Sequence, residues 1–217
     1  DGAPGVAYPQ LTGPVAVGDD VVVNVQAVAL GLGSGGFDVL AANLTRGLGL
    51  APEPGAHVIA QPYAPLQAAV RHVEEDGPLA SRLDGLPVVC CSLHSQLAPA
   101  CAALGLGRGT VYVQLAGGAL PVSLSDTVRA LRARGLLTAA VAVAPCFAGD
   151  VQAVSVASAL LWAAAGGARA VVCGIGPGVV GTGTPFGHGG LAAAQAANAA
   201  AALGGTAVVA ARVSGAD

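Results

Sequence analysis

The sequence predicts an α/β protein with a mainly parallel sheet and helices on both faces, preceded by a small antiparallel β unit that resembles part of a barrel. Two observations predict the sheet. Short apolar runs alternate with segments of helix length from residue 87 onward. Each run is apolar almost throughout, as expected for parallel strands covered on both faces. Strands and helices that alternate in this way form parallel sheets with right-handed crossovers.

The regular part of the chain defines its elements by residue range. The expected strands are 88–91, 111–115, 139–144, 170–173 and 207–211, and the expected helices are 96–104, 126–134, 151–165 and 190–203. The segment 151–165 repeats apolar residues at Val151, Val154 and Leu161, close to the helical period. Its polar residues and many alanines make it too weakly apolar for a membrane span, so we expect no membrane association.

The first part of the chain has a different pattern. Gly18 and Asp19 separate two valine-containing runs, which predicts a β-hairpin over residues 11–25. A strand is expected at 57–61, and Pro65 is expected to open a helix that closes near residue 77. We therefore predict a β unit over residues 1–45 and an α/β domain over residues 46–217.

Composition excludes several classes of function. Apolar residues make up 54% of the chain and charged residues 10%, which excludes a disordered chain. Nine arginines without a lysine form no basic patch, so nucleic acid is not an expected partner. Five cysteines in apolar surroundings indicate reduced, buried thiols of a cytoplasmic protein. No ligand spacing supports a metal site. Because the chain contains no Met, we expect that residues are missing before residue 1.

A glycine-rich stretch, residues 174–190, is the strongest candidate for a ligand loop. It follows an expected strand and precedes an expected helix, where backbone N–H groups can hold an anion. Eight glycines in seventeen residues match no named nucleotide motif. The alternative is a tightly turned connection that needs glycine for its backbone angles. The candidate ligand-binding residues in this stretch are Gly176, Gly178, Gly181, Thr182, Gly183 and Thr184.

The other candidates follow expected strands, so they should gather at the carboxyl edge of the sheet. His94 is a candidate general base or anion-contacting donor. Ser95 and Gln96 beside it are candidate ligand-binding residues, although Ser95 could equally cap the next helix. Asp126 and Asp150 are candidate catalytic acids or bases, and Ser125, next to Asp126, is a candidate ligand-binding residue. The alternative for both aspartates is a helix N-cap.

Two further residues complete this set of loops. Cys146 falls in a predicted strand-to-helix loop, where a helix N-terminus would lower its pKa, so it is the best candidate for a reactive thiol. Ser214 follows the last expected strand.

Several segments of the chain are distinctive when taken together. They include Leu30-Gly-Leu-Gly-Ser-Gly-Gly36, Ser92-Leu-His-Ser-Gln-Leu97 and Gly176-Pro-Gly-Val-Val-Gly-Thr-Gly-Thr-Pro-Phe-Gly187. With these segments the chain resembles the bacterial family DUF3866. The resemblance spans nearly the whole chain. It implies roles for His94, Ser95, Gln96, Asp126 and Asp150, but no activity, because none is established for the family. The chain departs from the pattern at Gln61, where a basic residue is expected, and its cysteines are not part of the pattern.

Two functions fit these observations. The first is binding of a small anionic metabolite, such as a phosphorylated one, at the carboxyl edge of the sheet, either with or without catalysis. The second is a non-catalytic regulatory or assembly role in which the glycine loops form subunit contacts. A homo-oligomer is expected in both cases because few charges cover the surface. No cofactor is indicated by the sequence.

Overall fold

A computed structural model describes residues 3–33, 35–213 and 215, so Ser214 lies outside the described residues. The chain divides into two compact units, Asp1–Val70 and Arg71–Asp217. We call them the N-terminal unit and the sheet unit. The expected domain boundary after residue 45 stays a prediction.

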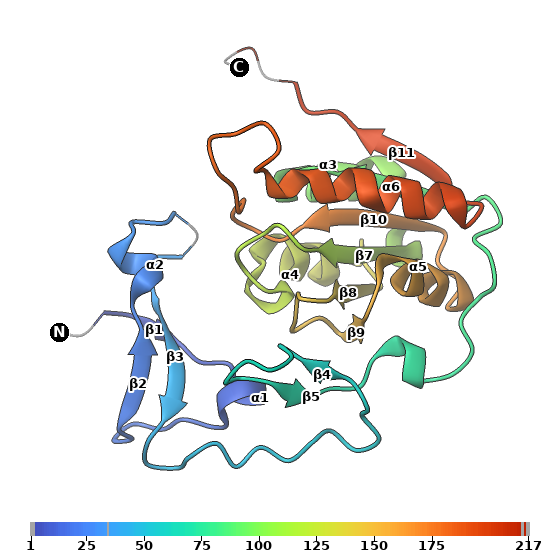
Figure 1. Cartoon of the computed structure of the whole chain (residues 1–217). Helices are drawn as coiled ribbons and strands as arrows, with labels where there is room; N and C mark the ends of the chain where they lie inside the picture. Colours follow the sequence, from blue (N-terminus) through green and yellow to red (C-terminus); the bar gives the residue numbers. More distant parts are fainter. Residues whose placement is uncertain (1–2, 34, 214, 216–217) are drawn as a thin grey trace. The chain divides into compact units, whose positions relative to one another are not determined.

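The sheet unit contains a six-stranded parallel sheet with the order β11-β6-β10-β7-β8-β9 (Figure 1). Its strands are β6 (Pro87–Cys91), β7 (Thr110–Leu115), β8 (Ala139–Val143), β9 (Val151–Ala153), β10 (Ala170–Ile175) and β11 (Thr206–Ala210). All five predicted strands are present. The predicted parallel α/β fold is therefore confirmed.

Helices cover both faces of this sheet. On one face, α5 (Val156–Ala165) and α6 (Ala192–Ala202) pack against alternate strand residues such as Val113 and Val171. On the other face, α3 (Leu97–Leu104) and α4 (Asp126–Ala133) pack against Tyr112 and Val172. Short 3₁₀ helices adjoin these elements: η1 (Val73–Glu75), η2 (His94–Gln96), η3 (Gly107–Gly109), η4 (Val122–Leu124) and η5 (Gly189–Leu191). None of the helices within the described ranges combines the length and apolar character needed to cross a membrane.

The prediction for the start of helix 151–165 is wrong. Residues Val151–Ala153 form β9, which pairs in parallel with β8, and α5 begins only at Val156. The connection from β8 to β9 contains no helix and returns the chain directly to the sheet edge. Neighbouring parallel strands are usually joined through a helix, so a strand directly after β8 is not expected. The apolar residues of 151–155 also continue the helical period of α5, so the sequence pattern predicts a helix where β9 lies.

The N-terminal unit contains a mixed three-stranded sheet, β1-β3-β2. The strand β3 (Asp38–Asn43) pairs antiparallel with β2 (Val21–Asn24) and parallel with β1 (Gly5–Val6). The predicted hairpin over residues 11–25 is wrong, because β2 pairs with β3 instead of with the residues before Gly18. Those earlier residues include α1 (Pro9–Thr12), and a second short helix, α2 (Gln26–Ala29), follows β2.

The predicted helix from Pro65 is also absent. Its residues instead include β5 (Ala68–Ala69), which pairs antiparallel with β4 (Ile59–Ala60), and only the short η1 follows. The backbone N–H of Val70 donates to the carbonyl of Val58, 3.1 Å away. Pairing with a segment about ten residues earlier thus satisfies the backbone hydrogen bonds of residues for which the local apolar period predicted a helix.

Candidate functional site

The chain changes direction at the carboxyl ends of two neighbouring strands, β6 and β10. The loop after β6 leads to α3 on one face of the sheet, and the loop after β10 leads to α6 on the opposite face. Such a topological switch point separates two loops and is where α/β proteins commonly bind ligands. His94 follows β6, and Ile175 ends β10.

His94 joins three of the segments that meet at this point. Its Nδ1 lies 3.0 Å from the carbonyl oxygen of Ile175, and its Nε2 lies 2.8 Å from the hydroxyl oxygen of Ser125. A carbonyl only accepts hydrogen bonds, so Nδ1 carries the proton and donates. Nε2 of the neutral ring therefore accepts from the Ser125 hydroxyl. Burial lowers the pKa of His94, which favours this neutral form.

Ser125 is the N-cap of α4. Its hydroxyl oxygen accepts from the backbone N–H of Val128, 3.0 Å away, while its proton points to His94. A hydroxyl between a neutral imidazole and a helix N-terminus has the chemistry of an activated nucleophile. However, Ser125 is 0% exposed, so no substrate reaches it in this conformation. The pair positions the loops rather than presenting a nucleophile.

Tyr112, on β7, completes the hydrogen-bond network around His94. Its hydroxyl lies 3.2 Å from the carbonyl oxygen of Gly174 and 3.0 Å from that of Ile175. Its ring meets the His94 ring edge to face, with centroids 6.0 Å apart. Burial raises the pKa of Tyr112, so the hydroxyl keeps its proton and donates it to a carbonyl. Sequence reasoning missed Tyr112 because it lies within a strand rather than after one.

Gln96 and Ser95 follow His94 but have different surroundings. The Gln96 side-chain oxygen accepts from the backbone N–H of Leu93 at 3.0 Å, and its nitrogen donates to the carbonyl of Ala210 at 2.8 Å. The Gln96 amide therefore ties the loop after β6 to β11. Ser95 is exposed and does not cap α3, whose N-cap is Gln96 without a side-chain hydrogen bond.

The glycine-rich stretch 174–190, called the glycine loop from here on, begins by packing against the loop that follows β7. A Cβ added to Gly118 would lie 2.3 Å from the carbonyl oxygen of Gly176, and one added to Gly117 would lie 2.5 Å from that of Gly189. Gly178 has φ 72°, and its carbonyl accepts from the backbone N–H of Ala119 at 2.7 Å. These glycines allow two backbones to touch, which accounts for part of the glycine content without a ligand.

The rest of the glycine loop is an exposed hairpin beyond the sheet (Figure 1). Gly181 pairs with His188, and the backbone N–H of Thr182 donates to the carbonyl of Gly187 at 2.6 Å. The hydroxyls of Thr182 and Thr184 lie 2.8 Å apart. A Cβ on Gly183 would meet nothing within 4 Å. This tip therefore keeps two hydroxyls at the surface in a fixed turn.

The two candidate aspartates lie in different places. Asp126 is the first residue of α4 rather than its cap, and it forms an exposed ion pair with Arg129. Asp150 precedes β9 instead of a helix. Its carboxylate accepts from the backbone N–H of Ala140 at 2.7 Å and pairs with Arg132. Because Ala140 lies near the start of β8, Asp150 lies toward the amino edge of the sheet and does not join His94.

The cysteines are free thiols within the described ranges, and all except Cys146 are buried. Burial raises the pKa of Cys90, Cys91 and Cys101 to about 11. The pKa of the half-buried Cys146 is also raised by burial, and β9 rather than a helix follows its loop. The expected lowering of its pKa is therefore wrong. Among the residues that the structure describes, no group of three His, Cys, Asp or Glu side chains is placed to hold a metal.

Fold and site together define a parallel α/β protein with polar residues around a topological switch point. The chain belongs to the family described as "Protein of unknown function (DUF3866)", whose model matches residues 4–217. Comparisons with curated proteins and with solved structures found no match.

Proposed function

We propose that the chain binds a small anionic metabolite, such as a phosphorylated one, at the carboxyl edge of the sheet. The observation that carries this proposal is the His94 ring, which is hydrogen-bonded through both nitrogens to the end of β10 and the start of α4. This arrangement fixes the loops after β6, β7 and β10 relative to one another before a ligand arrives. Binding then costs less ordering of the protein.

The donors near these loops suit an anion. Ser95 exposes a hydroxyl after β6, and the Thr182–Thr184 pair exposes hydroxyls after β10. Arg129, in the first half of α4, adds a partly exposed guanidinium whose position is fixed by Asp126 and by the carbonyl of Ser123. Sequence reasoning missed Arg129, although its spacing of three residues from Asp126 on a helix is a recognisable signal. Backbone and hydroxyl donors with one arginine favour a singly or doubly charged ligand.

Thermal unfolding tests this site with inorganic phosphate, glucose 6-phosphate and succinate, each against sodium chloride of equal ionic strength. A ligand at 100 times its Kd adds about 2.7 kcal/mol to the free energy of unfolding. Trp162, the single tryptophan, reports the unfolding of the sheet unit. We expect the shift in Tm to shrink in the double variant Thr182→Val/Thr184→Val and to persist in Thr206→Val, an exposed threonine of β11.

Two results would contradict the proposal. If none of the three anions shifts the Tm of the parent, the chain has no such anion site. If the Tm shift is equal in the parent and in Thr182→Val/Thr184→Val, the glycine loop takes no part in the site.

A second function is favoured by a separate observation, the apolar surface of the glycine loop. Phe186 is 89% exposed, and Val179 and Val180 of the same loop are also exposed. Apolar side chains gathered on one loop are typical of a contact surface. We propose that this loop binds another subunit, with a homo-oligomer as the simplest assembly.

Light scattering after gel filtration should give a mass above 20.7 kDa for the parent and a lower mass for Phe186→Ser. A parent that stays monomeric at all accessible concentrations excludes this role.

A further inference from the structure

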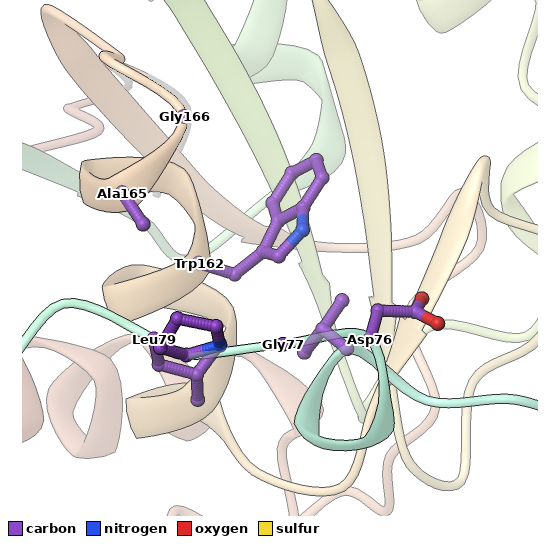
Figure 2. Close-up of a pocket in the computed structure, with 8 residues that line it drawn as sticks. Asp76, Gly77, Leu79, Trp162, Ala165 and Gly166 are labelled. Atoms are coloured by element: carbon purple, nitrogen blue, oxygen red, sulfur yellow. The ribbon is translucent and has the colours of Figure 1, made fainter.

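The sheet unit contains a hollow of about 220 Å³ whose lining does not include His94. Figure 2 shows the side chains that line it. It lies between the segment that begins with η1 and the last turn of α5. A short turn after α5 leads to the first residue of β10. The hollow is thus near the amino edge of the sheet, whereas His94 lies at the carboxyl edge. Its apolar lining comes from Val73, Pro78, Leu79, Trp162 and Ala165.

The polar groups around this hollow favour positive charge. Asp76 is the one ionisable residue of the lining, and its side chain is 44% exposed. One of its oxygens pairs with Arg71, which leaves the second oxygen for another donor. The C-terminal end of α5 also borders the hollow, with Ala165 as its last residue. The carbonyls of Trp162, Ala163 and Ala164 already accept from backbone N–H groups of the following turn, so this end adds only the remaining part of the negative helix dipole.

Trp162 adds an aromatic surface to the same hollow. Its indole extends away from α5, with the ring nitrogen on the edge toward Asp76 in Figure 2. Aromatic rings attract organic cations and also pack against apolar groups. A carboxylate oxygen, a helix C-terminus and an indole therefore surround a mainly apolar space.

We propose that this hollow binds a small organic cation, a primary or secondary ammonium on a compact apolar body. The ammonium donates to Asp76 beside the end of α5, and the apolar body packs against Val73, Leu79 and Trp162. The hollow, at about 220 Å³, is smaller than the pockets that take drug-sized ligands, so it suits a ligand of a single ring. Cyclohexylammonium has this size and charge, which makes it a suitable probe.

Trp162 is the single tryptophan of the chain, so its fluorescence reports this hollow directly. We expect cyclohexylammonium to change the Trp162 emission in a saturable way at pH 7 and constant ionic strength. Cyclohexanol, of equal size but neutral, should bind about threefold to tenfold more weakly. Cyclohexanecarboxylate should bind more weakly than cyclohexylammonium, because its charge meets the second oxygen of Asp76, while Arg71 on the first oxygen offsets part of the repulsion.

A pair of variants separates the carboxylate from general effects. Asp76→Asn should weaken cyclohexylammonium binding about threefold to tenfold and leave cyclohexanol binding unchanged. Asp84→Asn is the matched control, because Asp84 is an exposed aspartate that also pairs with an arginine, Arg82, at 3.5 Å. Its affinity for cyclohexylammonium should equal that of the parent.

Three results would overturn the proposal. They are equal affinity for cyclohexanol and cyclohexylammonium, unchanged affinity in Asp76→Asn, and absence of saturable binding both by fluorescence and by calorimetry. The hollow is independent of the proposed anion site, so failure of one proposal leaves the other standing.

Discussion

The two units of the chain are stabilised in different ways. In the sheet unit, two apolar clusters lie on opposite faces of six parallel strands and contain most of the buried side chains described for the chain. In the N-terminal unit, the buried residues are few, and Val21, Val22 and Val23 of β2 are all exposed. Its strands are held instead by a polar cluster around Asp19. Burial stabilises the first unit, and specific hydrogen bonds stabilise the second.

The Asp19 cluster shows how such a small unit fixes its strands. One carboxylate oxygen of Asp19 accepts from the backbone N–H of Ala16 at 2.9 Å, from the Asn43 amide at 2.9 Å and from Arg46 Nε at 2.6 Å. Asn43 in turn accepts from the backbone N–H groups of Thr45 and Arg46. The cluster thus joins the turn before β2 to the end of β3. These contacts depend on single residues, whereas an apolar cluster distributes its energy over many.

The largest predicted effect on the free energy of unfolding comes from a substitution in an apolar cluster of the sheet unit. Leu160, on α5, is fully buried, and Leu160→Ala should lower the free energy of unfolding by about 2–5 kcal/mol. Leu191→Ala, at an exposed position, should cost less than about 0.5 kcal/mol. Urea unfolding followed by Trp162 fluorescence measures both values, and hydrogen exchange reads the N-terminal unit separately. Loss of protection in both units of Leu160→Ala would contradict the contrast between them.

The second effect tests the close contact between the glycine loop and the loop that follows β7. Gly118→Ala places a Cβ against the backbone of Gly176, so it should destabilise the sheet unit by about 1–3 kcal/mol. Gly183→Ala is the matched control, since its Cβ would enter open space. We expect the control to unfold like the parent in the same urea experiment. Equal stability of the two variants would show that the glycines serve some purpose other than backbone packing.

The same contrast explains which parts of the fold could be predicted from the sequence. The strands of the sheet unit are apolar runs separated by helices, and this local pattern is enough to place β6, β7, β8, β10 and β11. The strand β9 was missed because Val151–Ala153 continue the period of α5 and return to the sheet without a crossover helix. In the N-terminal unit, β2 and β5 pair with segments that no local pattern identifies. The predicted hairpin and helix failed there for that reason.

The candidate site was predictable to a similar extent. His94 and Ser125 follow from the rule that ligands gather where parallel strands end, and the structure places them 2.8 Å apart. The carbonyl of Ile175 fixes the His94 tautomer, but a backbone group leaves no trace in the sequence. Asp150 was placed wrongly because its position depends on β9. An error in one strand thus moved a candidate residue to the opposite edge of the sheet.

The third effect concerns the His94–Ser125 pair. Ser125→Ala removes both the N-cap of α4 and the hydroxyl that donates to His94, so it should cost about 0.5–2 kcal/mol. Ser95→Ala, at an exposed neighbour of His94, should cost less. Thermal unfolding at pH 8 compares the two variants. Equal Tm values would show that the pair contributes nothing to the stability of the edge.

The pH dependence of stability tests His94 itself. Burial lowers the pKa of His94 from its usual value of 6.5, so the unfolded chain takes up the proton first as the pH falls. The contribution of His94 is therefore complete above about pH 6.5 and declines below it. His94→Gln should flatten the fall in Tm between pH 7 and pH 5. A parent whose Tm stays constant over this range would contradict the lowered pKa.

The smallest effect is confined to the N-terminal unit and to low pH. Hydrogen bonds from Arg46 and Asn43 hold the pKa of Asp19 well below its usual range, and its side chain is 6% exposed. Because the folded form releases its proton more readily, Asp19 stabilises the unit above about pH 4, and this contribution is lost as the pH falls further. In Asp19→Asn, hydrogen exchange in β2 and β3 should be faster at pH 7, and its pH dependence below pH 4 should be weaker. Asp20→Asn, a change at the adjacent exposed aspartate, should keep the exchange pattern of the parent. If both variants exchange alike, the unit is stabilised by its apolar residues after all, and the contrast with the sheet unit is one of size alone.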